Sequence, residues 1–392
     1  MSCVGSADCV VNGSDPASLS SLSAVTSNGG YSWTPRSIAV GVGGIQAISC
    51  PLLRVCIAVG SDADTAYALR TTDGGRAWSA QSMNAAVVSL SAVSCGSPLD
   101  CVAVGHGMPE EGFQGFEGAV VTTSDGGALW RSVSLPSEVG SLSAVSCATA
   151  TRCLALGEAP PTTSPSESVP GGTYEAIAIS TRNGGSSWSS PVTIPATNYV
   201  QGVSCSSASS CVAVGQQFPV DPPGAAIPVA EVTRDGGKAW VGHPLPGRGE
   251  QPIAISCASP SRCVVVGAVN PQLTYDGIFF SEPAGPVVPG ALMVSSDGGA
   301  HWSLSTKLRV GNLVGVSCPS PTFCALVGSN RSGTRPVLLI GDPGQSPLSI
   351  ANPINGPRSF LEVSCRTIRA CEVVGQSAFG GGLIVQARTL SR

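Results

Sequence analysis

Short apolar runs alternate with turn-forming residues along the chain, and one arrangement of them recurs eight times. An apolar run ends in Ser-Cys, five residues follow, and a second Cys begins another apolar run that ends in Gly. The stretches "AVSCATATRCLALG" (144–157) and "GVSCSSASSCVAVG" (202–215) show this pattern. Two apolar runs joined by a turn of this kind predict a β-hairpin. We therefore expect eight hairpins along the 392 residues.

The predicted hairpin tips contain all sixteen cysteines of the chain. Directly opposed residues of antiparallel strands have Cα atoms about 4.5–5.5 Å apart, which a disulfide can span. Free thiols and zinc ligands are the alternatives, but zinc sites commonly use other Cys spacings together with histidines, and the chain has three histidines. The predicted bridges are Cys3–Cys9, Cys50–Cys56, Cys95–Cys101, Cys147–Cys153, Cys205–Cys211, Cys257–Cys263, Cys318–Cys324 and Cys365–Cys371.

The cysteine content and the net charge limit the possible compartment and partners of the protein. A disulfide in every hairpin is typical of an oxidising compartment, so we expect an extracellular or cell-surface protein. The start "MSCVGSADCV" lacks the features of a signal peptide, and we expect the sequence to begin inside a longer chain. A net charge of −4 disfavours a nucleic-acid partner, and the longest apolar runs are too short for a membrane span. No motif indicates a cofactor or a metal site, and we expect a monomer.

A second string lies between the hairpins: Ser or Thr, any residue, Asp or Asn, two glycines, two more residues and Trp. Examples are "TTDGGRAW" (71–78) and "TSDGGALW" (123–130), and the six copies contain all six tryptophans. The string resembles the Asp-box, or bacterial neuraminidase repeat, of β-propellers. Its acidic or amide residue and its Trp are, in chain order, Asn28 and Trp33, Asp73 and Trp78, Asp125 and Trp130, Asn183 and Trp188, Asp235 and Trp240, and Asp297 and Trp302.

The resemblance implies an all-β propeller of four-stranded antiparallel blades. It places the box at the turn between the third and fourth strands of a blade, where the Asp or Asn side chain caps backbone N–H groups and the Trp packs between sheets. We expect a structural role for these acids and not a catalytic one. The seventh unit, "IGDPGQSP" (340–347), lacks the Trp, and the sequence ends about where an eighth box would begin. We expect one propeller domain over 1–392 with eight blades, and seven blades are the alternative.

Spacing along the chain separates two faces. From the box Trp to the next Cys the separation is 17 residues five times and 16 once, whereas from the second Cys to the next box it ranges from 15 to 32. In an up-and-down blade the cysteine tips and the boxes share one face, here called the stapled face. The variable connections project from the other face, here called the loop-bearing face. Binding residues are found disproportionately on such loops.

Candidate ligand-binding residues follow from this division. Aromatic and acidic residues of the insertions and polar residues just before a first strand are expected on the loop-bearing face. They are Phe113, Phe116, Tyr275, Asp276, Phe279, Phe280, Tyr199, Arg248, Glu250 and Arg358. No residue is assigned a catalytic role.

Three functions are compatible with the resemblance. Asp-box propellers include sialidases, xyloglucan-cleaving glycosidases, sortilin-like receptors and photosystem II assembly factors, and fold similarity alone does not carry function. Sialidases usually have an Arg-Ile-Pro motif, which is absent, and glycosidases need two carboxyl groups at one bond, for which no spacing is visible. We therefore favour a non-catalytic scaffold that binds a protein or a glycan. The alternatives are a glycoside hydrolase and an assembly factor that binds a client protein.

Overall fold

The structure is a computed structural model. It describes the chain except for residues 1, 5–7, 16–19, 27–33, 38–43, 53–54, 63–64, 74–76, 85, 109–115, 161–174, 219–225, 248–249, 270–289, 306–307, 309, 332–335, 345–347, 352–356, 368–369, 378–381 and 388–392. For the strands before Ile45 and after Leu348 the account that follows concerns the backbone.

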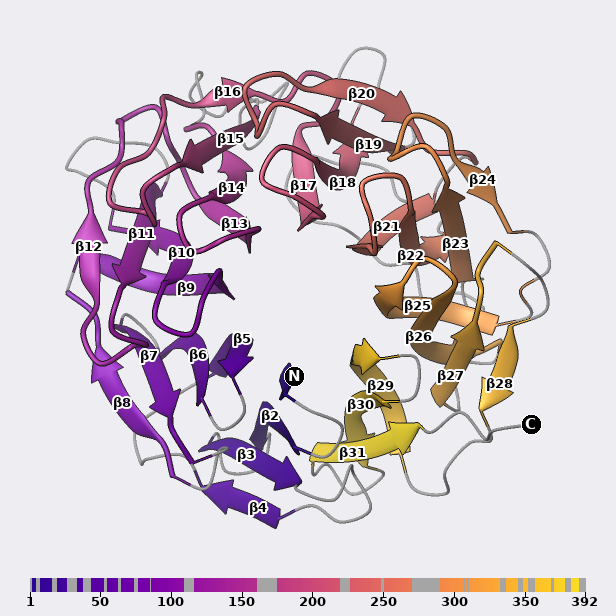
Figure 1. The fold of residues 1–392 in the computed structure, drawn as a ribbon, viewed down its shortest axis with the longest axis horizontal. Coiled ribbons are helices and arrows are strands. Elements are labelled where there is room, and N and C mark those ends of the chain that lie inside the picture. The colour runs from indigo at the N-terminus through magenta and orange to yellow at the C-terminus, as the bar shows by residue number, and fades with distance from the viewer. Residues whose placement is uncertain are drawn as a thin grey trace, which may run out of the picture.

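The described residues form seven four-stranded sheets and one three-stranded sheet, all antiparallel. Strands that are consecutive in the chain pair with each other, so each sheet is an up-and-down unit. The sheets follow one another around a ring, with the first strand of each near the centre and the last at the outer edge (Figure 1). The all-β prediction is confirmed.

The first four sheets contain β1 to β16. Their strands are β1 (Ser2–Val4), β2 (Asp8–Asp15), β3 (Ser20–Thr26), β4 (Thr34–Ser37), β5 (Gly44–Leu52), β6 (Val55–Asp62), β7 (Thr65–Thr71), β8 (Ser79–Ser82), β9 (Val87–Cys95), β10 (Cys101–Gly107), β11 (Glu117–Thr123), β12 (Arg131–Val133), β13 (Leu142–Cys147), β14 (Cys153–Glu158), β15 (Ala176–Thr181) and β16 (Val192–Thr193).

The remaining four sheets contain β17 to β31. Their strands are β17 (Tyr199–Cys205), β18 (Cys211–Gln217), β19 (Ile227–Thr233), β20 (Val241–Pro244), β21 (Glu250–Cys257), β22 (Cys263–Val269), β23 (Gly290–Ser295), β24 (Ser303–Leu304), β25 (Val310–Ser320), β26 (Phe323–Asn330), β27 (Pro336–Gly341), β28 (Ser349–Ala351), β29 (Pro357–Thr367), β30 (Ala370–Ser377) and β31 (Gly382–Ala387). The last sheet, β29 to β31, has three described strands.

Six of the predicted disulfides are present, each within its own hairpin. They join Cys50–Cys56, Cys95–Cys101, Cys147–Cys153, Cys205–Cys211, Cys257–Cys263 and Cys318–Cys324. In the first and last hairpins the backbone places Cys3 opposite Cys9 and Cys365 opposite Cys371, while their side chains lie outside the described part. Six disulfides in the described residues indicate an oxidising compartment.

Replacing both Cys205 and Cys211 with Ser is expected to lower the free energy of unfolding by roughly 2 kcal/mol, because the open loop regains entropy in the unfolded chain. Urea unfolding under non-reducing conditions measures the change. The same measurement in excess reductant is the control, since the parent and the double variant should then unfold at more similar urea concentrations. A double variant as stable as the parent without reductant would contradict the structural role of this bridge.

The Ser of five described Ser-Cys pairs links neighbouring sheets. The N–H of the first Cys in one sheet donates to the hydroxyl oxygen of the corresponding Ser in the preceding sheet. The donor and acceptor are Cys95 and Ser49 (3.2 Å), Cys147 and Ser94 (3.0 Å), Cys205 and Ser146 (3.3 Å), Cys257 and Ser204 (3.0 Å), and Cys318 and Ser256 (3.1 Å). This repeated bond fixes the register between these sheets and gives a structural reason for the Ser before the first Cys.

The Asp-boxes form the expected capped turns. In the third sheet, Asp125 Oδ1 accepts hydrogen bonds from the N–H groups of Ala128 (2.9 Å) and Leu129 (3.0 Å), and the Gly127 N–H donates to Thr123 Oγ1 (2.9 Å). The two glycines of this box, Gly126 and Gly127, have φ values of 72° and 85°, a conformation that other residues adopt at a cost. These hydrogen bonds lower the pKa of Asp125, with the Leu129 N–H as the largest cause. The first box, with Asn28 and Trp33, lies outside the described residues.

The box Trp packs between its own sheet and the preceding one. Trp240, 7 % exposed, lies in a cluster with Leu154 and Leu156 of β14 and Ala213 of β18. Trp130 packs half-buried against a cluster of residues from the second and third sheets. The packing predicted for the box Trp is confirmed at these positions.

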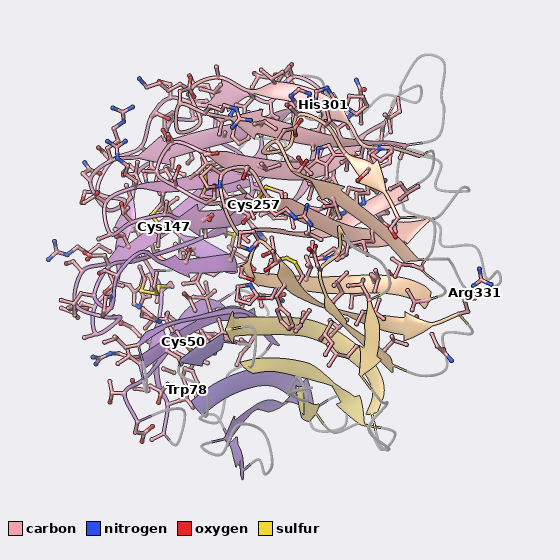
Figure 2. All side chains as sticks on the ribbon, turned by 45° about the vertical axis from the view of Figure 1, so that its right-hand side comes forward. Cys50, Trp78, Cys147, Cys257, His301 and Arg331 are labelled. Atoms are coloured by element: carbon pink, nitrogen blue, oxygen red, sulfur yellow. A yellow bond between two sulfur atoms is a disulfide. The ribbon has the colours of Figure 1, made fainter. Side chains whose placement is uncertain are left out.

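The cysteine tips and the boxes lie on one face, as the spacing predicts. Within four sheets the first box Gly donates its N–H to a carbonyl of the hairpin tip, from Gly126 to Leu99 (2.9 Å), Gly184 to Thr151 (3.1 Å), Gly236 to Ser209 (3.0 Å) and Gly298 to Ser261 (2.8 Å). In Figure 2 Cys50 and Cys147 lie toward one side of the molecule and Arg331, which directly follows β26, lies at the opposite side. The stapled face and the loop-bearing face are therefore distinct surfaces.

Candidate functional site on the loop-bearing face

A glycine ends the apolar run of every second strand and marks the border of the loop-bearing face. At Gly105, Gly157 and Gly215 the first strand of the sheet contains a bulge, and a Cβ would overlap the backbone carbonyl of Ser89, Ser141 or Tyr199. The strand can therefore approach its neighbour only without a side chain at this position.

The residue after this glycine varies among the sheets, with five residue types at eight positions. The eight residues are Ser14, Ser61, His106, Glu158, Gln216, Ala268, Ser329 and Gln376. The preceding residues of the same strands are mostly Val, Ala, Leu and Ile, and the stapled face repeats its cysteine pairs and box residues. Around the inner border of the loop-bearing face, a uniform scaffold thus carries side chains of unequal chemistry. We call these eight positions the polar ring.

Ser61 of the polar ring contacts the first strand of the next sheet, and Glu158 of the ring interacts electrostatically with Tyr199 of the next sheet. Ser61 Oγ lies 3.2 Å from Ser89 Oγ, so β6 and β9 are joined by a hydroxyl pair. At the equivalent place between the fourth and fifth sheets, Glu158 ends β14 and Tyr199 begins β17. Burial raises the pKa of the Glu158 carboxyl to about 7. Burial, and then the charge of Glu158, raises the pKa of the Tyr199 hydroxyl.

The pair of Glu158 and Tyr199 can therefore present two protonated oxygens near neutral pH. A neutral carboxyl group and a phenol both donate and accept hydrogen bonds. Such a pair suits a ligand with hydroxyl or amide groups, and perturbed titrating groups often mark functional sites.

The segment before Tyr199 is held firmly. Thr197 Oγ1 lies within hydrogen-bond distance of two carbonyl oxygens, those of Gln216 (2.8 Å) and Tyr199 (2.9 Å). The Asn198 side chain contacts the backbone of Phe218 twice, with the Phe218 N–H donating to Asn198 Oδ1 at 3.0 Å. These contacts fix the start of β17, so Tyr199 is presented by a rigid connection.

A buried carboxyl group lies behind the same connection. Glu231, in the middle of β19, has no exposed surface, and its Oε1 accepts a hydrogen bond from the Ala196 N–H (2.7 Å). Its Oε2 has no hydrogen-bond partner among the described residues. Burial raises the pKa of Glu231 to about 7, and the Ala196 hydrogen bond opposes this rise. The equivalent residues two positions before the box Ser or Thr are apolar: Leu69, Val121, Ile179 and Met293.

The structure describes part of the predicted candidate set. Tyr199 lies at the inner border of the loop-bearing face, and Phe116 is 53 % exposed with its ring 4.4 Å from the His106 ring. Glu250 and Arg358 lie in β21 and β29, and only the backbone of these two residues is described. Phe113, Arg248, Tyr275, Asp276, Phe279 and Phe280 lie outside the described residues.

Sequence reasoning missed Glu158, Gln216 and Glu231. The signal for the first two was present, since each follows a Gly that ends an otherwise uniform apolar run. Glu231 could have been found as a single acid at a position that is apolar in the neighbouring units. Within the described part of the chain, no group of three or more His, Cys, Asp or Glu side chains could hold a metal ion. Across the same residues, no helix is both long and apolar enough to cross a membrane.

Comparisons with known proteins identify the fold. No protein-family model and no curated protein matches the chain. A solved structure described as YCF48 bound to D1 peptide matches with a TM-score of 0.53 and 15 % identity, over 87 % of this chain and 89 % of that chain. Hydrazine synthase from Kuenenia stuttgartiensis matches with a TM-score of 0.58 and 9 % identity, over 89 % and 97 % of the two chains.

Glycosidases also appear among the structural neighbours, with weaker similarity. A GH74 xyloglucanase from Xanthomonas campestris has a TM-score of 0.42 and 13 % identity, over 93 % of this chain and 61 % of that chain. At these identities the matches concern the fold alone. The structural neighbours of this chain include proteins of the kinds that the Asp-box resemblance names.

Proposed function

We propose that this chain is a secreted or cell-surface β-propeller that binds a protein or a glycan on its loop-bearing face and catalyses no reaction. The observation that carries the proposal is the contrast between the faces. The stapled face repeats the paired cysteines and the Asp-box residues, whereas the polar ring contains five residue types at its eight equivalent positions. The disulfides support an oxidising compartment.

The proposal takes residues 1–392 as one domain of eight blades that is a monomer. The eight described sheets support eight blades, with the seam between the last and first sheets. In Figure 1 β31 and β2 are neighbours in the ring, and β29 and β1 are in contact. Seven blades would leave a surplus strand pair.

Within this proposal Tyr199, Arg248, Glu250 and Arg358 contribute to ligand binding from the inner border, with Phe113, Phe116, Tyr275, Asp276, Phe279 and Phe280 in the insertions. The neighbour described as bound to a peptide supports a protein ligand only by its fold. An assembly factor that holds a client protein is one form of this function.

Replacing Tyr199 with Phe is expected to weaken ligand binding about two- to tenfold, the usual worth of one hydrogen bond, with nearly unchanged melting temperature. A glycan array and a peptide array, probed with the parent and the variant, measure the effect. Leu129→Ala is the matched control, because Leu129 is 61 % exposed on the stapled face and should leave binding intact. Equal binding by the parent and Tyr199→Phe to every ligand found would remove Tyr199 from the site.

One observation favours a glycoside hydrolase as the second candidate. A carboxyl group whose pKa is near 7 has the chemistry of a general acid for glycoside cleavage, as Glu158 could supply. Chromogenic sialosides and β-glucosides test this candidate. Turnover that is lost in Glu158→Gln would show that the chain is a hydrolase and not a non-catalytic scaffold. A non-catalytic scaffold should give no turnover.

A further inference from the structure

A cavity of about 410 Å³ opens on the loop-bearing face of the third sheet. It lies between the ends of β10 and β11 and the connection that leads from β12 to the fourth sheet. Val87, Val120 and Val139 form buried parts of its wall, and Glu117, Ser132 and Ser134 add polar groups. Its volume is within the range of small-ligand sites, about 300–1,000 Å³.

The cavity exists because the connection that follows β12 separates from the edge of β11. In the second, fourth and fifth sheets the residue after the fourth strand donates one more hydrogen bond to the third strand, from Met83 to Ala66 (2.8 Å), Ile194 to Ala176 (2.8 Å) and Leu245 to Pro228 (3.0 Å). Continuing the register of β11 and β12, in which Val120 is opposite Val133, places Leu135 opposite Gly118, which like Ala66, Ala176 and Pro228 lies five residues before its box. The Leu135 N–H makes no such bond, and the described residues place no other backbone donor on the Gly118 carbonyl at this edge.

The connection returns to the sheet four residues later. The Gly118 N–H donates to the Val139 carbonyl (3.0 Å), and a Cβ on Gly118 would lie 2.5 Å from the Gly140 carbonyl oxygen. The connection thus detaches over residues 134–138 and closes again at Val139. Between the detached connection and β11 lies the cavity, in which the Gly118 carbonyl oxygen on the edge of β11 is available as an acceptor. An extended peptide that adds to a sheet edge uses such an acceptor.

Two exposed apolar residues are next in sequence to lining residues of the cavity. Met108 follows the lining residue Gly107 and is 56 % exposed, and Phe116 precedes the lining residue Glu117 and is 53 % exposed. Phe116 rests against the His106 ring, which fixes one of its faces. Exposed apolar side chains beside a cavity often mark an interaction site.

The charges around the cavity are negative. Glu117 lines it, Glu138 lies in the detached connection, and neither forms an ion pair or a side-chain hydrogen bond with the described residues. The Lys and Arg residues of the described part of sheets two to five all lie at or beside the tips of the stapled face. They are Arg70, Arg131, Arg152, Arg182, Arg234 and Lys238. A positive ligand group is therefore attracted to this region, and an anion is not.

We propose that this cavity binds an extended peptide segment that carries a lysine or an arginine. A backbone N–H of the peptide donates to the Gly118 carbonyl in place of the Leu135 N–H. The cationic group pairs with the Glu117 carboxylate, and the methylene stem lies against Phe116 and Met108, where a cation–π contact adds to the attraction. This inference rests on the proposed function, since it assigns a ligand class to the same face.

The test uses blocked, fluorescent pentapeptides of Thr and Val with Lys, Arg, Gln or Glu at the centre, measured by fluorescence anisotropy with the whole chain. The Lys and Arg peptides should bind at least tenfold more tightly than the Glu peptide, and more weakly at high salt. Glu117→Gln should lower the affinity for the Lys peptide roughly tenfold, and Phe116→Ala should lower it as well. Glu175→Gln is the matched control, because Glu175 is exposed on the same face but does not line the cavity.

Each other outcome overturns the inference. Equal affinity for the Lys and Glu peptides, equal effects of Glu117→Gln and Glu175→Gln, or no peptide binding at all would exclude a cationic peptide site. Binding of neutral oligosaccharides that Glu117→Gln abolishes would assign the cavity to a glycan. The proposed function would survive these results if Tyr199→Phe still weakened binding of an array ligand, so the two failures are distinguishable.

Discussion

Replacing Trp240 with Ala is expected to lower the free energy of unfolding by about 3–5 kcal/mol, as for other buried large aromatic residues. Trp240 is 7 % exposed and packs against Leu154 and Leu156 of the preceding sheet and Ala213 of its own. Its Nε1 has no hydrogen-bond partner among the described residues, so the substitution leaves no acceptor unpaired there. The loss is therefore one of packing between two sheets.

Urea unfolding of Trp240→Ala, followed by circular dichroism, measures this loss. Val241→Ala is the matched control, since Val241 is the next residue, is 58 % exposed and should change stability by no more than about 0.5 kcal/mol. The same midpoint for Trp240→Ala and Val241→Ala would contradict the packing of the box Trp between sheets.

The free energy of unfolding is expected to fall as the pH rises from about 5 to about 8, because Glu231 holds its proton more tightly in the folded chain. The pKa of Glu231 rises from the ordinary 4.5 to about 7 when it is buried. Between these values the unfolded chain loses the proton while the folded chain keeps it, so stability declines with pH. The contribution is fully present below the unfolded pKa and is lost as the pH passes the folded pKa. The total loss is about 3 kcal/mol.

Urea midpoints of the parent and Glu231→Gln over this pH range test the prediction. Gln keeps an acceptor for the Ala196 N–H but does not titrate, so the variant should show a smaller decline. Glu158, whose pKa burial also raises to about 7, acts in the same direction, and the double variant with Glu158→Gln should be flatter still. A Glu231→Gln variant with the same decline as the parent would show that Glu231 does not titrate in this range.

The candidate site was predictable only in its location. The spacing placed the variable connections on one face, and Tyr199 and Phe116 lie there. The electrostatic effect of Glu158 on Tyr199 was not visible, because the two residues are 41 positions apart and belong to different sheets. The perturbed pKa of Glu231 depends on burial and on the Ala196 N–H, neither of which is local in sequence.

The sequence by itself determined the repeated unit. Its hairpins, its six described disulfides, the capped Asp-box turns and the two faces depend on contacts between residues close in the chain, and repetition made each signal visible several times. Only the tertiary structure decided which hydrogen bonds each unit makes with its neighbours and where the cavity forms. The hydrogen bond from each Cys to the Ser of the preceding sheet, and the missing bond between Leu135 and Gly118, are set by packing between strands and sheets. A local pattern cannot specify such contacts, because the same residues form or lose them according to what their neighbours in space allow.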